Sequence, residues 1–337
     1  MKKIKVNKLI YSLIVSISGL LLSLFVNRGY FIIESVVGTE YKNIMSSEKI
    51  ENYGRLGHRL LTPFLSKIFD DIFVFNILVL AIWLFYITFN LYDKYEESTL
   101  LLLIFSITSS QIIIFTLNFA YYPDPLTILL TTIALFNIEN NYLFTFLGFL
   151  NLINNEVGLF ILLFLVFVSK KRVTKMQLLI LVIFLYLIYR QIISMYVQND
   201  SSGISTYILE LGNFDLNFFM LFGLFSGLKF LSLFLISTKK PFTIFIFLIF
   251  YILVPLNMAV DYTRYGTLLI VVILWVLNNN SFKFNRNLKM IALLVLILNI
   301  ITPKYYIWGD QLTYLRDSKL HLFDITGKNF EERSINK

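Results

Sequence analysis

Apolar runs recur along almost the whole chain. The first extends from Leu9 to Val26, and further candidate spans cover residues 72–92, 98–118, 126–138, 142–153, 157–169, 176–198, 217–237, 241–258, 265–278 and 290–303. A helix that crosses a bilayer needs about twenty residues, so the three runs between 126 and 169 predict shortened helices, a re-entrant pair or one span fewer. The pattern predicts an all-α polytopic integral membrane protein with about eleven transmembrane helices, in a range of about nine to twelve.

The amino-acid composition is that of a protein whose surface partly contacts lipid. Hydrophobic residues make up 57% of the chain and charged residues 15%, whereas a soluble domain carries about 25% charged residues. The chain has no cysteine and two histidines, which excludes disulfides and thiolate metal sites and leaves little for a His-rich metal centre. The net charge of +8 does not indicate nucleic acid, because the basic residues stand between apolar runs.

The distribution of lysine and arginine predicts the orientation. With the N-terminus in the cytoplasm, the inner segments hold about as many cations as the outer ones in about a third of the length, including Lys170-Lys171-Arg172. An odd number of spans then places the C-terminus outside. We expect one transmembrane domain over residues 1–303, containing an extracytoplasmic loop at 27–71 with interfacial helices, and a short polar tail at 304–337.

The loop at 27–71 combines an apolar repeat with cations. Thr62 followed by Pro63 predicts an N-cap and the first position of a helix. His58 and Arg59 then point away from the hydrocarbon interior of the membrane. They face either the phospholipid headgroups or a substrate. Apolar residues recur at every fourth position, as on one face of a helix that lies at the membrane interface: Leu56, Leu60, Phe64 and Ile68.

Further polar residues interrupt the apolar sequence. An ionisable group in a membrane segment is costly, so it usually has a partner and often a function. Each of these residues also has a structural interpretation. Asp124, before Pro125, could cap a helix, and Glu156, after two asparagines, could serve only as a hydrogen-bonded part of the fold. Asp261 and Arg264 could pair at a helix end, while Arg190 is long enough to snorkel.

Under the predicted orientation, several carboxylates and arginines lie close together at the extracytoplasmic face of the membrane domain. Arginine binds phosphate bidentately and keeps its charge when partly buried. A nearby carboxylate can take the proton from a sugar hydroxyl as it attacks. The sequence contains no nucleotide-binding glycine loop, Walker motif or zinc signature. These residues therefore favour chemistry on an anionic lipid headgroup. A Mg²⁺ or Mn²⁺ ion bridging phosphate and carboxylate is compatible with them, but their spacing does not require one.

The order of these motifs resembles that of the bacterial multi-spanning GT-C-type glycosyltransferases. It runs from acidic residues in the first loop through Arg59-Leu-Leu-Thr-Pro63, Asp124 and Asn155-Glu156 to Asp261-x-x-Arg264. The resemblance covers roughly residues 1–280 as sparse positions. It implies an enzyme of the bacterial cytoplasmic membrane that moves a sugar from a polyprenyl-phosphate donor to a glycan or lipid acceptor at the extracytoplasmic face.

The resemblance also assigns expected roles. Glu34 or Glu40 would take the acidic-loop role, with Glu40 the closer match, and Arg59 and Arg264 would lie near the donor phosphate. The first loop lacks an Asp-Asp or Asp-x-Asp pair, so the identity of the base stays open. The expected site comprises Glu40, Asp124 and Glu156 as catalytic residues, Arg59, His58, Arg264 and Arg190 around the donor phosphate, and Glu34 and Asp261 in support.

Two other functions fit the sequence pattern. An O-antigen-type polymerase is similarly rich in Phe, Ile and Leu and uses outward-facing arginines. Such a protein usually carries its large loop in the second half of the chain, whereas the largest loop here is the first. A lipid-linked-sugar flippase or small-solute transporter would need charged residues along a path to both faces, together with broken helices.

Overall fold

The computed structural model describes residues 2–27, 41, 43–46, 59–118, 122–196, 230–231, 233–234, 270–279, 286–302, 305–308 and 311–314. Of the predicted spans, 217–237 lies largely, and 241–258 entirely, outside these residues. The same is true of five predicted site residues: Glu34, Glu40, His58, Asp261 and Arg264.

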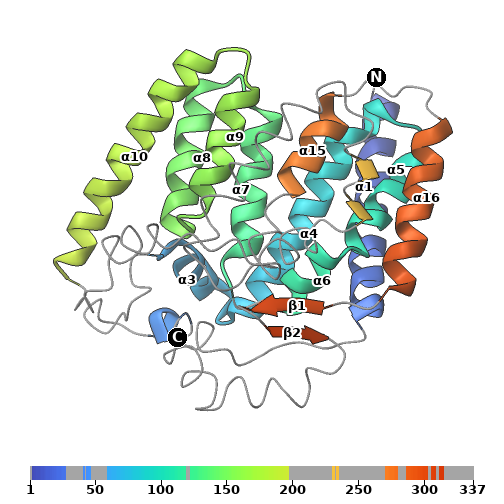
Figure 1. Ribbon diagram of the computed structural model, residues 1–337, viewed down its shortest axis with the longest axis horizontal. Coiled ribbons are helices and arrows are strands. Elements are labelled where there is room, and N and C mark those ends of the chain that lie inside the picture. Colours follow the sequence, from blue (N-terminus) through green and yellow to red (C-terminus); the bar gives the residue numbers. More distant parts are fainter. Residues whose placement is uncertain are drawn as a thin grey trace.

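The described elements are helices, apart from one short hairpin (Figure 1). The hairpin pairs β1 (Tyr305–Trp308) with β2 (Gln311–Tyr314) in antiparallel register, inside the predicted polar tail. The helices are α1 (Lys2–Asn27), α3 (Leu61–Ser66), η2 (Lys67–Phe69), α4 (Ile72–Leu91), η3 (Tyr92–Lys94), α5 (Glu97–Thr108), α6 (Gln111–Asn118), α7 (Asp124–Phe136), α8 (Asn141–Asn154), α9 (Gly158–Val168), α10 (Arg172–Ser194), α15 (Ile270–Asn279) and α16 (Arg286–Ile301).

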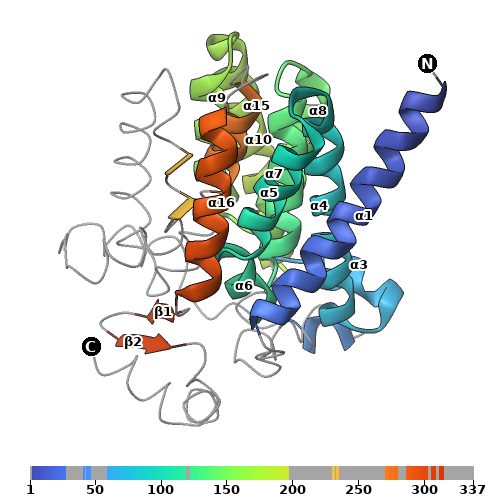
Figure 2. The ribbon, with the colours of Figure 1, turned by 90° about the vertical axis from the view of Figure 1, so that its right-hand side faces the viewer.

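The long helices stand side by side as a bundle (Figures 1 and 2). Contacts run from α10 through α8, α7 and α4 to α1, and from α1 through α5 to α16, while α9 and α15 pack against α7. Helix α4 lies in the centre of this series. Its Trp83 is fully buried, and the indole Nε1 donates to Thr132 Oγ1 of α7 at 2.9 Å. A buried indole N–H needs such a partner, so this contact fixes how α4 and α7 face each other.

Three described helices are long and apolar enough to cross a membrane: Val6–Val26, Ile72–Lys94 and Arg172–Ser194. Five shorter apolar helices accompany them, over 97–108, 124–136, 158–168, 270–279 and 287–301. The outward faces of α1 and α10 carry large exposed apolar side chains, among them Leu21, Phe25, Ile180 and Phe184. Surfaces of this kind suit contact with lipid. The helical class is therefore confirmed and is compatible with a membrane protein, while the predicted total of about eleven spans includes residues outside the described part and is not confirmed.

Two local predictions were wrong. The expected span 98–118 is broken into α5 and α6 at Ser109 and Ser110, whose hydroxyls bond back to the carbonyls of Ser106 and Ile107. Serine hydroxyls compete in this way with the helical hydrogen-bond pattern. Thr62 is not an N-cap, because α3 already begins at Leu61 and its N-cap residue is Leu60.

The two ends of the bundle bring different turns together. At one end, Lys8 pairs with Asp93 at 2.6 Å, Lys94 donates to the Asn278 carbonyl, and Lys289 donates to Ser98 Oγ at 3.0 Å. The N-terminus and the α9–α10 turn lie at this upper end in Figure 1, whereas α3, α6 and the hairpin lie at the lower end. The lower end also holds the α8–α9 junction, where the candidate site is built.

Candidate functional site

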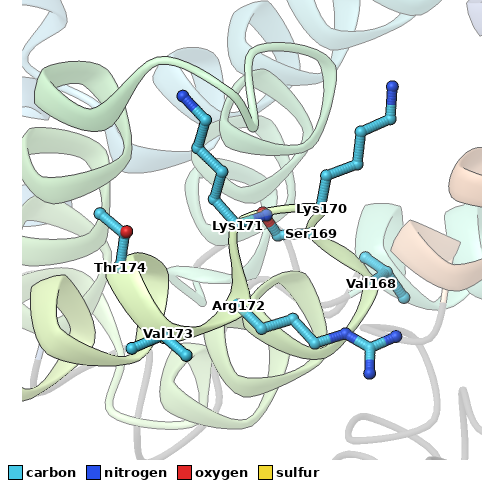
Figure 3. A pocket seen from close by; sticks show the side chains of 7 residues that line it. All are labelled: Val168, Ser169, Lys170, Lys171, Arg172, Val173 and Thr174. Atoms are coloured by element: carbon cyan, nitrogen blue, oxygen red, sulfur yellow. The ribbon is translucent and has the colours of Figure 1, made fainter.

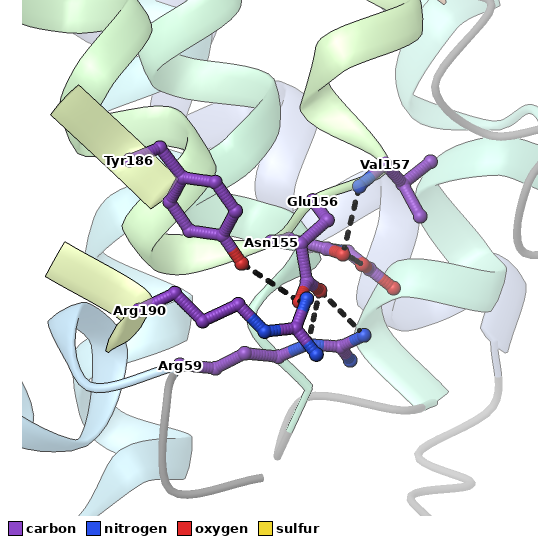
Figure 4. A network of polar contacts seen from close by, with 7 residues as sticks. Arg59, Asn155, Glu156, Val157, Tyr186 and Arg190 are labelled. Atoms are coloured by element: carbon purple, nitrogen blue, oxygen red, sulfur yellow. Dashed lines mark hydrogen bonds and ion pairs between the residues drawn. The ribbon is translucent and has the colours of Figure 1, made fainter. Parts of the chain in front are cut away.

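Glu156 is the centre of a charged cluster at the lower end of the bundle (Figure 4). Arg59 approaches one carboxylate oxygen, with its Nε and Nη2 each 2.8 Å from Oε2. The other oxygen, Oε1, accepts from the Tyr186 hydroxyl at 2.8 Å and lies 3.5 Å from Nη1 of Arg190. The structure therefore brings together three of the predicted site residues, Glu156, Arg59 and Arg190, with Tyr186 as a fourth member.

The members of the cluster come from three segments of the chain. Glu156 lies in the short turn between α8 and α9, where Asn155 ends α8 and its Oδ1 accepts from the Val157 backbone N–H at 3.3 Å. Tyr186 and Arg190 are one turn apart on α10, so their side chains project from the same face. Arg59 directly precedes the N-cap residue of α3. Residues from three separate segments thus converge on one carboxylate.

The electrostatics of the cluster favour an anion. Two guanidinium groups face one carboxylate, and the side chains of Arg59, Arg190 and Glu156 are 18%, 25% and 26% exposed. Partial burial strengthens charge–charge contacts and leaves a route for a ligand. The Arg190 contact is the longer of the two, so this guanidinium is the one better placed to turn toward an added anion. Glu156 holds both cations close together.

Asp124 lies next to the cluster but is buried. It is the first residue of α7, whose N-cap residue is Pro123, so the predicted capping role was wrong. The carboxylate Oδ1 instead accepts from Asn155 Nδ2 at 3.1 Å, and the residue is 4% exposed. Asn155 therefore links Asp124 to the backbone turn that carries Glu156. Asp124 can take part in chemistry at the cluster only if this contact opens.

A network of buried amide and hydroxyl groups lies next to the turn that carries Glu156. Asn154 Oδ1 accepts from Thr62 Oγ1 of α3 at 2.6 Å, while its Nδ2 donates to the Pro123 carbonyl at 2.8 Å and to Thr127 Oγ1 at 2.9 Å. One side chain therefore ties α3, α7 and α8 together. Buried polar networks that are satisfied in this way make a structure rigid.

Close packing at the start of α9 also positions the turn. Gly158 lies against the side chain of Asn151, and a Cβ added at position 158 would lie 2.2 Å from Asn151 Nδ2. Asn151 is 1% exposed, and neither atom of its amide has a hydrogen-bond partner among the described residues. Position 158 therefore accepts only glycine without a shift of Asn151 or of the turn itself.

The segment that follows Glu40 in the sequence lies beside the cluster. Tyr41 is fully buried with Ile44 and Ile72, and the partly buried Leu60 and Ile193 pack against them. Leu60 adjoins Arg59, and Ile193 lies one helical turn beyond Arg190. Glu40 itself is outside the described residues.

Sequence reasoning missed Tyr186, Thr62 as a side-chain donor, and the Asn155–Asp124 contact. The spacing of Tyr186 and Arg190 by four residues on a predicted helix was a usable signal for the first. Contacts between Thr62 and Asn154 or between Asn155 and Asp124 join segments far apart in the sequence, so no spacing rule indicates them.

Within the described residues, no three His, Cys, Asp or Glu side chains group closely enough to hold a metal ion. Comparison with known proteins gives no relative: no protein-family model, no curated protein and no solved structure matches the chain significantly.

Proposed function

We propose that the chain is an integral membrane glycosyltransferase of the GT-C type. In this proposal it transfers a sugar from a polyprenyl-phosphate donor to a surface glycan or lipid at the extracytoplasmic face of a bacterial cytoplasmic membrane. The observation that carries the proposal is the convergence of Arg59 and Arg190 on Glu156, in a part-buried cluster whose described residues hold two guanidinium groups and one carboxylate. Such a cluster at the end of an apolar bundle suits a phosphate whose lipid tail lies along the helices.

The proposed roles follow from the contacts. Arg59 and Arg190 bind the donor phosphate, and Glu156 with Tyr186 holds them in place. The acceptor hydroxyl oxygen attacks the anomeric carbon and the bond from that carbon to the phosphate oxygen breaks. The polyprenyl phosphate leaves with the bonding electrons, and the hydroxyl proton passes to a carboxylate. Asp124 and Glu40 are the candidate bases, and Arg264, His58, Glu34 and Asp261 keep the roles that the sequence resemblance implies.

Mass spectrometry of lipid extracts from cells with and without the gene tests this function. Loss of the gene is expected to make a polyprenyl monophosphate monosaccharide accumulate and one sugar disappear from a surface glycan, because the donor is no longer consumed. Complementation with the wild-type gene should reverse both changes. Accumulation of polyprenyl diphosphate repeat units would instead identify a polymerase or flippase, and an unchanged lipid profile would contradict the proposal.

A further inference from the structure

A second cationic surface lies at the opposite end of the bundle, where α9 joins α10. Lys170, Lys171 and Arg172 follow one another in this turn and all three are exposed. None of the ion pairs within the described part of the chain involves them. An exposed group of like charges attracts ligands of the opposite sign.

Residues 168–174 line a shallow, open depression of about 550 Å³ in this turn (Figure 3). The ammonium groups of Lys170 and Lys171 extend to the same side of the turn, as the figure shows. The guanidinium carbon of Arg172 lies 5.1 Å from the centre of the Phe167 ring, so this aromatic side chain supports the third cation. Hydroxyl groups of Ser169 and Thr174 complete the polar lining.

The faces of the two helices next to this depression are apolar. Phe167 and Leu163 of α9 are partly exposed, and Val173 and Ile180 of α10 are 74% and 60% exposed. A free phosphate ion would use only the cations. A phospholipid uses both features, because its headgroup lies among the cations and its acyl chain lies along the apolar helix faces.

We propose that the α9–α10 turn binds the headgroup of an anionic phospholipid, with Lys170 and Lys171 as its principal contacts and Arg172 beside Phe167 at its edge. The nearby Lys175 does not belong to this site, because it is buried over the Phe144 ring at 4.7 Å. The proposed lipid site is separate from the Glu156 cluster and does not depend on the proposed transferase activity.

Native mass spectrometry of the purified full chain tests the lipid site, using micelles that contain phosphatidylglycerol and phosphatidylcholine in equal amounts. The wild-type protein is expected to retain phosphatidylglycerol preferentially. The double variant Lys170→Gln/Lys171→Gln should lose roughly tenfold in this preference, because each surface cation contributes to anionic-lipid binding. The charge-conserving variant Lys170→Arg/Lys171→Arg and the variant Lys289→Gln, which removes an exposed cation elsewhere at the same end, should keep it.

Two results would overturn the proposal. One is a wild-type protein without preference for phosphatidylglycerol, and the other is an unchanged preference in the double glutamine variant. Soluble glycerol phosphate distinguishes the lipid from a free phosphate: it should displace little of the bound phosphatidylglycerol, and efficient displacement would show that the acyl chain contributes nothing.

Discussion

Replacing Glu156 by glutamine is expected to lower sugar transfer by about a hundredfold while the protein still inserts into the membrane. The carboxylate accepts from Arg59, Arg190 and Tyr186, and hydrogen bonds to charged groups each contribute about 1.5–3 kcal/mol. A glutamine amide presents an N–H₂ group to these donors and no negative charge. The two guanidinium groups then repel each other and no longer hold the geometry that binds phosphate.

The measurement is the rate of transfer from a polyprenyl-phosphate sugar by the purified variant. Glu139→Gln is the matched control, because it removes an exposed carboxylate from the α7–α8 turn at the other end of the bundle. A Glu156→Gln protein that transfers sugar at the wild-type rate would exclude a role for the cluster in the reaction.

Replacing Gly158 by alanine is expected to destabilise the protein by about 2 kcal/mol, since extra methyl groups in a packed interior typically cost 1–3 kcal/mol. The new Cβ would lie 2.2 Å from Asn151 Nδ2 and 2.6 Å from its Cγ. Asn151 is buried, so it cannot move into solvent, and either its side chain or the turn that carries Glu156 has to shift within the packed interior. Thermal unfolding in detergent measures the loss, and transfer activity should fall with it.

Two further variants isolate the cause. Gly148→Ala in α8 should not lower stability, because a Cβ there meets Leu162 and Val182 at an ordinary 3.5 Å and alanine favours helix over glycine by about 1 kcal/mol. Asn151→Ala combined with Gly158→Ala should recover most of the loss, because the clashing amide is gone and it made no hydrogen bonds. A Gly158→Ala protein as stable as wild type would show that the contact is not tight.

Apolar runs predicted most of the described helices, because burial in lipid or in a helical bundle leaves a continuous signal along the chain. The predicted spans 126–138, 142–153 and 157–169 correspond to α7, α8 and α9 within two residues at each end. The break between α5 and α6 was missed, since one pair of serines changes hydrophobicity little but provides alternative hydrogen bonds.

Three members of the site were predictable from the sequence, but Tyr186 and the contacts among the members were not. Glu156, Arg59 and Arg190 stood out because charged residues in apolar sequence are costly. The contact of Glu156 with Arg59 depends on how α3 and α8 pack through Thr62 and Asn154, and this packing has no signature in the sequence. The role of Asp124 was mistaken for the same reason, since its partner Asn155 lies in the distant turn between α8 and α9.

Binding of polyprenyl phosphate to the purified chain tests the central claim most directly, namely that the cluster around Glu156 binds the donor phosphate. Wild-type protein, Arg59→Ala and the control Lys67→Ala, which removes an exposed cation near the same end, would be titrated in the same membrane mimetic. The account predicts that Arg59→Ala binds roughly ten- to a hundredfold more weakly, as expected for lost charged hydrogen bonds, while Lys67→Ala binds as wild type does. Equal affinity of all three proteins would contradict it.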